Sequence, residues 1–154
     1  MNLLIEIIFK GVLSSVNFNF LKDLVMRAKE LYFNSPEISS VKTFDEVIEI
    51  LNANAYIDLV LNTDELKIYN KDVPKVFINL GRNYNDIELL FFFDLQDLND
   101  LTVKESVDCL MDWTTEFKNN YKFDYFICRA DNAGDGEYYF DSQGTGSLYN
   151  ITSS

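Results

Sequence analysis

The segment IELLFFFDL, residues 87–95, decides the fold. A strand with one solvated face alternates apolar and polar side chains, whereas Leu89 to Phe93 are apolar at every position. This short apolar run follows the turn residues GRNYND (81–86), which predicts a strand rather than a helix. We expect this strand to lie in the middle of a sheet and to be covered on both of its faces.

Further strands are expected before and after this segment. Turn residues separate several apolar or alternating stretches that are typical of strands. The expected strands are 3–13, 55–61, 66–70, 75–80, 122–130 and 137–141, with a short one at 147–151.

Three helices are expected between the strands. Apolar residues recur at helical spacing in 18–33. The segments TFDE (43–46) and TVKE (102–105) have the capping-box pattern, so helices should start there and run to about residues 54 and 119. The order βαα-ββββ-αββ indicates one α+β domain over residues 1–154, with a mostly antiparallel sheet.

The composition restricts the classes of function. The 154 residues carry a formal net charge of -12, with a pI near 4.3. This charge repels nucleic acids and anionic membranes and attracts basic proteins, so we expect a protein partner. The chain has no histidine and no Walker A sequence, which excludes Ser-His-Asp, Cys-His and HExxH sites. We expect no cofactor, no metal and no enzymatic activity.

Two observations indicate the cellular location. The two cysteines, Cys109 and Cys128, are too few for a disulfide scaffold and suit a reducing compartment. The N-terminal stretch MNLLIEIIFKGVLSS has no basic residue before its apolar run, which is also too short to span a bilayer. We therefore expect a cytoplasmic protein.

The segment DNAGDGEYYFDSQGTGSLY, residues 131–149, looks like a ligand-binding loop at two places. Counted as an EF-hand loop from Asp131, it has alanine at position 3 and serine instead of the bidentate acid at position 12. Gly144-Thr-Gly146 lacks the third glycine of a dinucleotide-binding turn, where Tyr149 stands. We interpret the segment as a turn, a tyrosine-bearing strand and a glycine bend that permits positive φ.

Four acids gather on one face of the helix expected at 103–119. At 100° per residue, they fall within a sector of roughly 80°, opposite the apolar face. These acids are Glu105, Asp108, Asp112 and Glu116. Trp113 lies between the acids and the apolar face, where we expect it to be partly exposed and to anchor a partner. The alternative is a solvated helix face on which Trp113 closes the edge of the core.

A second acidic cluster is expected in the C-terminal segment. Asp131, Asp135 and Glu137 stand there close to Tyr138. Tyrosines offer rigid contact area with polar tips, which suits the recognition of a basic protein. The alternative is that the tyrosines only cover a strand.

A small, acidic, histidine-free α+β chain without a catalytic motif resembles the immunity proteins of bacterial toxin–immunity systems. The resemblance covers the whole chain in size, class and charge, and it extends to DYFICRADNAGDGEYYFDSQGTGSLY (124–149) after an acidic helix. It implies a cytoplasmic inhibitor that binds a cognate, often basic, toxin domain stoichiometrically and has no chemistry of its own.

Two other functions stay open from the sequence. A carboxylate-based, metal-dependent hydrolase would use acids from 87–95 and 131–137. An acidic DNA mimic would space its carboxylates like phosphates along an elongated surface. The oligomeric state is not determined by any of these patterns.

Overall fold

One antiparallel sheet of eight strands forms the body of the protein. The structure is a computed structural model that describes residues 3–98, 101–134 and 136–152. The strand order is β10-β9-β8-β1-β7-β6-β3-β2. These strands are β1 (Leu4–Val12), β2 (Glu30–Ser35), β3 (Tyr56–Thr63), β6 (Val76–Asn83), β7 (Asp86–Asp94), β8 (Tyr125–Ala130), β9 (Phe140–Asp141) and β10 (Gly144–Thr145). The other elements are the hairpin of β4 (Leu66–Ile68) and β5 (Lys71–Val73), the helices α1 (Phe20–Arg27), α2 (Phe44–Ala53) and α3 (Val103–Tyr121), and the 3-10 helices η1 (Leu95–Asp97) and η2 (Tyr149–Ile151).

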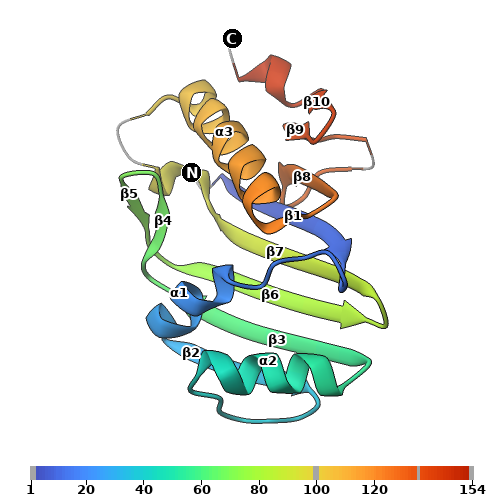
Figure 1. Cartoon of the computed structure of the whole chain (residues 1–154). Coiled ribbons are helices and arrows are strands. Elements are labelled where there is room, and N and C mark those ends of the chain that lie inside the picture. The colour runs from blue at the N-terminus through green and yellow to red at the C-terminus, as the bar shows by residue number, and fades with distance from the viewer. Residues whose placement is uncertain (1–2, 99–100, 135, 153–154) are drawn as a thin grey trace.

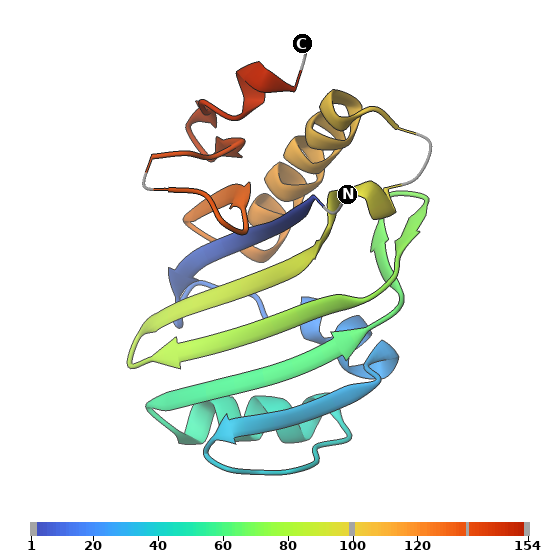
Figure 2. The same ribbon diagram turned by 180° about the vertical axis from the view of Figure 1, so that it is seen from behind.

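The three α-helices lie on one face of the sheet. Figure 1 shows them in front of the strands, and the reverse view in Figure 2 shows the strands in front of the helices. Every neighbouring pair of strands is antiparallel. The expected α+β class, with three helices and a mostly antiparallel sheet, is therefore confirmed.

Strand β1 joins the C-terminal strands β8, β9 and β10 to the strands β7, β6, β3 and β2. It pairs with β7 along its whole length and with β8 over Ile5–Lys10. Its side chains on the helix side are fully buried, and the ring of Phe9 lies at their centre. The ring centroids of Phe91, Trp113, Phe117, Phe123 and Phe126 lie 4.7–6.3 Å from that of Phe9. This aromatic cluster holds α3 against the sheet.

Strand β7 lies between β1 and β6, in the middle of the sheet as its sequence predicts. Its odd-numbered residues from Ile87 to Phe93 are buried on the helix side. The expectation that both faces are covered is wrong, because Leu90 and Phe92 point to the other face and are only half-buried. Among the described residues, no helix packs on that face (Figure 2).

The helix expected at 18–33 ends early, at Arg27. Residues 30–35 form β2 instead, which pairs with β3 along the edge of the sheet. Leu31 and Phe33 are buried on the helix side, whereas Tyr32 between them is half-buried on the opposite side. Leu31 and Tyr32 happen to continue the helical spacing of α1, so the sequence pattern could not reveal that a distant strand pairs with them.

Two strands near the C-terminus also differ from expectation. The strand expected at 137–141 is reduced to Phe140–Asp141, and the one expected at 147–151 is wrong, since 149–151 form a 3-10 helix. The sequence pattern also missed β5, which folds back on β4. By contrast, the helix starts are confirmed: the hydroxyl of Thr43 accepts from the Glu46 amide at 3.2 Å, and Thr102 and Glu105 form a complete capping box.

The two faces of the sheet predict different costs for the same substitution. Phe9→Ala should lower the free energy of unfolding by about 3–5 kcal/mol, because it leaves a cavity in the aromatic cluster. Phe77→Ala, on the opposite face and 36% exposed, is the matched control and should cost less, about 1–2 kcal/mol. Urea unfolding of both variants measures the difference, and equal losses would contradict the assignment of the core to the helix side.

Candidate functional site

Two of the four acids on α3 bind neighbouring groups of the chain, and the other two are exposed without an ion pair among the described residues. The Glu105 carboxylate accepts a hydrogen bond from the Thr102 amide at 3.0 Å, which lowers the pKa of Glu105. Asp112 and Glu116 are exposed on the same helix. Among the described residues, neither takes part in an ion pair within 4 Å. These two carboxylates are therefore available to a partner.

Asp108 connects α3 to the C-terminal segment. Its carboxylate lies 2.7 Å from the Lys104 ammonium and accepts a hydrogen bond of 2.7 Å from the Tyr149 hydroxyl. Both groups lower the pKa of Asp108, with Lys104 as the larger cause. The Lys104 ammonium also lies 5.5 Å from the centre of the Tyr149 ring. The role of Asp108 in the fold is thus to fix the position of residues 148–152.

The tip of the β4–β5 hairpin adds an aromatic residue that the sequence pattern did not reveal. Tyr69 is 46% exposed and has a positive φ of 57°. Partial burial, followed by the negative charges of the nearby Glu116 and Asp112, raises the pKa of Tyr69 to about 12. Cys109 on the same side of α3 is half-buried, and burial followed by the Asp112 charge raises the pKa of its thiol.

Trp113 does not lie where the sequence pattern placed it. Only 9% of the residue is exposed, and its ring packs against Phe9, Phe91 and Phe117. The expectation of a partly exposed Trp113 is therefore wrong. Trp113 stands at the border between the acidic and the apolar faces of α3, but its ring turns inward and packs in the aromatic cluster under the helix. The exposed aromatic residue beside the acids is Tyr69.

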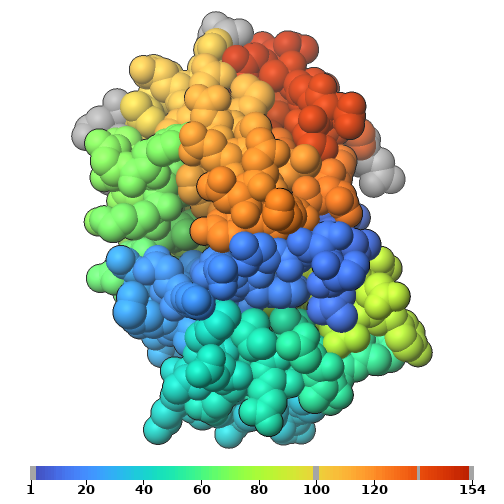
Figure 3. Space-filling view, in the orientation of Figure 1, coloured from blue at the N-terminus to red at the C-terminus, as the bar shows by residue number. Residues whose placement is uncertain are grey.

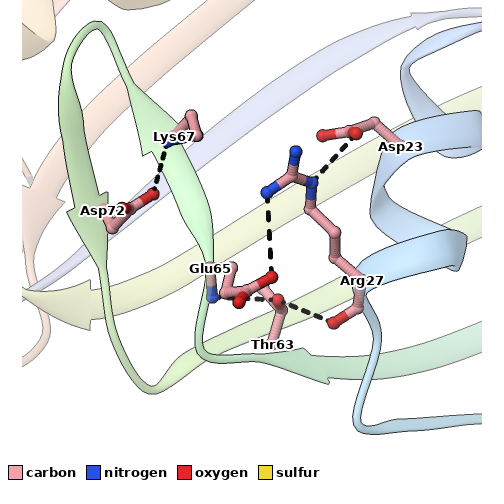
Figure 4. Close-up of polar contacts among 6 residues, drawn as sticks. All are labelled: Asp23, Arg27, Thr63, Glu65, Lys67 and Asp72. Carbon is pink, nitrogen blue, oxygen red and sulfur yellow. Dashed lines mark hydrogen bonds and ion pairs between the residues drawn. The ribbon is translucent and has the colours of Figure 1, made fainter.

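A shallow groove of about 180 Å³ runs between α1, β4 and α3. Trp113, Phe117 and Tyr121 form its wall on α3, while Asp23 and Lys67 lie at its rim. Figure 4 shows how Arg27 links α1 to the start of the β4–β5 hairpin: its guanidinium lies 3.0 Å from Asp23 on α1 and 3.7 Å from Glu65 before β4. On the hairpin, Lys67 lies 3.0 Å from Asp72.

A backbone contact reinforces this link between the hairpin and α1. The Thr63 hydroxyl donates to the Arg27 carbonyl at 3.1 Å (Figure 4). The side chain and the backbone of Arg27 therefore both hold the base of the β4–β5 hairpin, which carries Tyr69 at its tip.

The second acidic cluster lies on the C-terminal segment beside α3. Asp131 follows β8 and is exposed, as is Glu137, whereas Tyr138 is half-buried. Asp135 lies outside the described residues. Figure 3 shows the C-terminal segment, in red, next to α3, in orange, on the same face of the molecule. The structure thus places the two sequence segments side by side, connected by Asp108 and Tyr149.

Glycines shape this segment. Gly144 has a φ of 142°, as expected for a glycine bend. A side chain on Gly146 would meet the Tyr138 carbonyl oxygen at 2.4 Å, so only glycine permits this close approach. Tyr138 also accepts a hydrogen bond from the Leu148 amide at 3.0 Å. In residues 3–98, 101–134 and 136–152, no group of three or more His, Cys, Asp or Glu side chains could hold a metal ion.

The family comparison gives the class of the protein. The model of the PABL017 Cdi1I immunity protein family matches residues 3–148, so the chain belongs to this family of immunity proteins. No curated protein matches the chain. None of the described helices is long and apolar enough to cross a membrane.

A solved structure has the same fold. It is a chain from the crystal structure of the toxic C-terminal tip of CdiA from Pseudomonas aeruginosa in complex with immune protein. The TM-score is 0.69 at 16% sequence identity, and the match covers 96% of this chain and 99% of that chain. The similarity at this identity concerns the fold.

The contacts of Asp108 predict a dependence of stability on pH. Its pKa in the folded state lies below the value of about 3.9 for an unfolded chain. The ionised carboxylate therefore stabilises the protein above about pH 4, and this contribution is lost as the pH falls through the lower folded pKa. Asp108→Asn should be less stable than the parent protein at pH 7, and the difference should shrink below about pH 4.

Urea unfolding between about pH 7 and pH 2 measures this effect. Asp131→Asn removes one exposed carboxylate of the other cluster and serves as the control, with little change in stability expected at any pH. A difference between Asp108→Asn and the parent protein that stays constant over the whole range would contradict the electrostatic role of Asp108.

Proposed function

We propose that this chain neutralises a cognate toxin domain in the cytoplasm by binding it stoichiometrically, without chemistry of its own. The observation that carries the proposal is the match of an immunity protein family over residues 3–148. The similar solved chain, which comes from a complex of a toxin tip with immune protein, supports a protein partner.

The exposed acids support a basic partner. A net charge of -12 raises the encounter rate with a positively charged protein, and carboxylates can stand in for the phosphates that a basic nuclease holds. Asp112 and Glu116 form no ion pair within 4 Å among the described residues, and Tyr69 supplies exposed aromatic area next to Glu116. Aromatic residues surrounded by polar groups are common at the centres of protein interfaces.

The proposed contact surface therefore differs from the residues that the sequence pattern selects. It consists of Tyr69, Asp112 and Glu116, with Asp131, Glu137 and Tyr138 on the neighbouring segment and Asp135 between them in the sequence. Glu105 and Asp108 contribute negative potential while their carboxylates hold the helix start and the C-terminal segment. Trp113 supports this surface from beneath.

Reversing the exposed charges should slow association. The double variant Asp112→Lys and Glu116→Lys should lower the association rate constant with the cognate toxin domain by roughly tenfold at low salt, because electrostatic steering is lost. The loss should shrink as salt is added, since ions screen these charges. Stopped-flow or surface-plasmon measurements over a range of salt concentrations test this.

A matched control reverses charge elsewhere. The double variant Asp45→Lys and Glu49→Lys changes two exposed acids, also four residues apart, on α2, which lies on the same face of the sheet but away from α3 (Figure 1). It should change the association rate constant much less than the double variant on α3. Equal effects would show that only net charge matters, and no effect in either would remove the α3 face from the contact surface.

A further inference from the structure

The face of the sheet away from the helices carries apolar side chains. Outward positions on a solvated antiparallel sheet are usually polar. Here several outward positions of β1, β3, β6, β7 and β8 are apolar. They are Ile8, Val60, Phe77, Leu90, Phe92 and Ile127, which we call the outer apolar patch.

The outer apolar patch is separate from the hydrophobic core. Ile8 and Val60 are only 6% and 4% exposed, yet neither belongs to the core cluster on the helix side. Leu90, Phe92 and Ile127 are half-buried and do not pack against that cluster either. Among the described residues, no helix crosses this face (Figure 2). The accessible apolar surface of this face therefore comes from Phe77, Leu90, Phe92 and Ile127, and exposed apolar surface of this kind is typical of interaction sites.

We propose that the outer apolar patch binds a second copy of this chain in a two-fold symmetric dimer. Two twisted sheets pack face to face about 10 Å apart with their strands nearly aligned. In a two-fold dimer each subunit offers the same patch, so the patch must be complementary to itself. The register of the strands shows which outward residues lie side by side in one row across the sheet, and therefore which residues the two-fold axis would bring together.

A two-fold axis along the strands, between β6 and β7, brings apolar residues together. One row across the sheet contains Glu6, Phe92, Phe77 and Asn62, and the axis places Phe92 opposite Phe77 of the second copy. In the next row, the axis places Ile8 opposite Val60 and Leu90 opposite Asn79 of the second copy.

The same axis also pairs opposite charges. Lys10 and Arg129, the two cations that point out of this face, lie on β1 and β8, whereas Asp58 and Glu30 lie on β3 and β2. The axis exchanges these two sides of the sheet. It therefore places Lys10 opposite Asp58 and Arg129 opposite Glu30 of the second copy.

The size of the face is sufficient for a dimer. The six strands from β8 to β2 are about 4.8 Å apart and rise about 3.3 Å per residue, which gives roughly 700 Å² for a length of about eight residues. Stable interfaces bury roughly 600–1,000 Å² per partner, so the face is large enough. A dimer through these faces would cover most of the patch on each copy.

The distribution of charge on this face suits a second copy, because Lys10 and Arg129 lie on one side of the axis and Asp58 and Glu30 on the other. Arg129 also pairs with Glu6 within the chain, and Asp58 accepts hydrogen bonds from Asn79 and Asn34. The exposed acids of α3 lie on the helix side instead. A dimer through the sheets would point both acidic helix faces outward, which keeps the largest negative charges apart and leaves them free to bind toxin.

Sedimentation equilibrium of the purified chain tests the dimer directly. We expect a reversible monomer–dimer equilibrium between roughly 1 and 200 µM. Phe77→Lys should weaken dimerisation by about tenfold or more, because it buries a charge at the centre of the patch. Met26→Lys, a 74% exposed apolar residue on α1, is the matched control and should leave the dimerisation constant unchanged.

A charge swap tests the symmetry. Lys10→Glu should weaken the dimer by about tenfold, and the double variant Lys10→Glu with Asp58→Lys should restore it to within about threefold of the parent protein. In the double variant the new carboxylate still lies opposite Glu88 within the chain, so a purely intramolecular cause would leave the dimer weak. Urea unfolding confirms that each variant is folded.

Several results would overturn the proposal. These are a monomer over the whole concentration range, a dimer insensitive to Phe77→Lys, or a double variant that remains as weak as Lys10→Glu alone. A monomer whose Phe77→Lys variant loses affinity for the cognate toxin domain would instead assign the patch to the toxin. None of these outcomes depends on the acidic face of α3.

Discussion

The pairing of β1 with both β7 and β8 is the constraint on which the rest of the structure depends. Residues 30–94 supply β2, β3, β6 and β7, while residues 125–145 supply β8, β9 and β10, and β1 lies between these two groups. The pairing of Ile5 with Ala130 joins positions far apart in the sequence. Because Phe9 on the same strand packs beneath α3, β1 also fixes where the acidic helix stands relative to the sheet. The proposed contact surface for the toxin therefore depends on a strand that contributes no residue to it.

The acids of α3 illustrate how a helix can serve folding and binding at once. Carboxylates four residues apart on a helix repel each other by a few tenths of a kcal/mol. Lys104 offsets this repulsion for Asp108, and Glu105 gains the hydrogen bond of the helix start. Asp112 and Glu116 stay exposed, and among the described residues neither forms an ion pair within 4 Å. The arrangement costs some stability, which is consistent with a surface selected for a basic partner in a protein of the immunity family.

The two faces of the sheet differ in the range of the forces that they offer. Carboxylates on the helix side act over the Debye length of about 8 Å at physiological salt, so under the proposed function they guide an approaching partner. The outer apolar patch acts only on contact, because the hydrophobic effect depends on area removed from water. Trp113, which combines an aromatic ring with acidic neighbours in the sequence, belongs to neither surface, since its ring fills the space between α3 and β1.

The sequence by itself determined the features that depend on neighbours along the chain. It predicted the central position of 87–95, the helix starts at Thr43 and Thr102, and the shared face of the four acids on α3, because caps and periodicity are local. Only the tertiary structure decided that 30–35 form a strand, that Trp113 is buried, and that Asp108 binds Tyr149 while Tyr69 reaches Glu116. It also decided that Leu90 and Phe92 face away from the helices. Each of these depends on which distant segments meet, and local patterns do not encode that choice, since the same apolar residue fits a core, an edge or an open face.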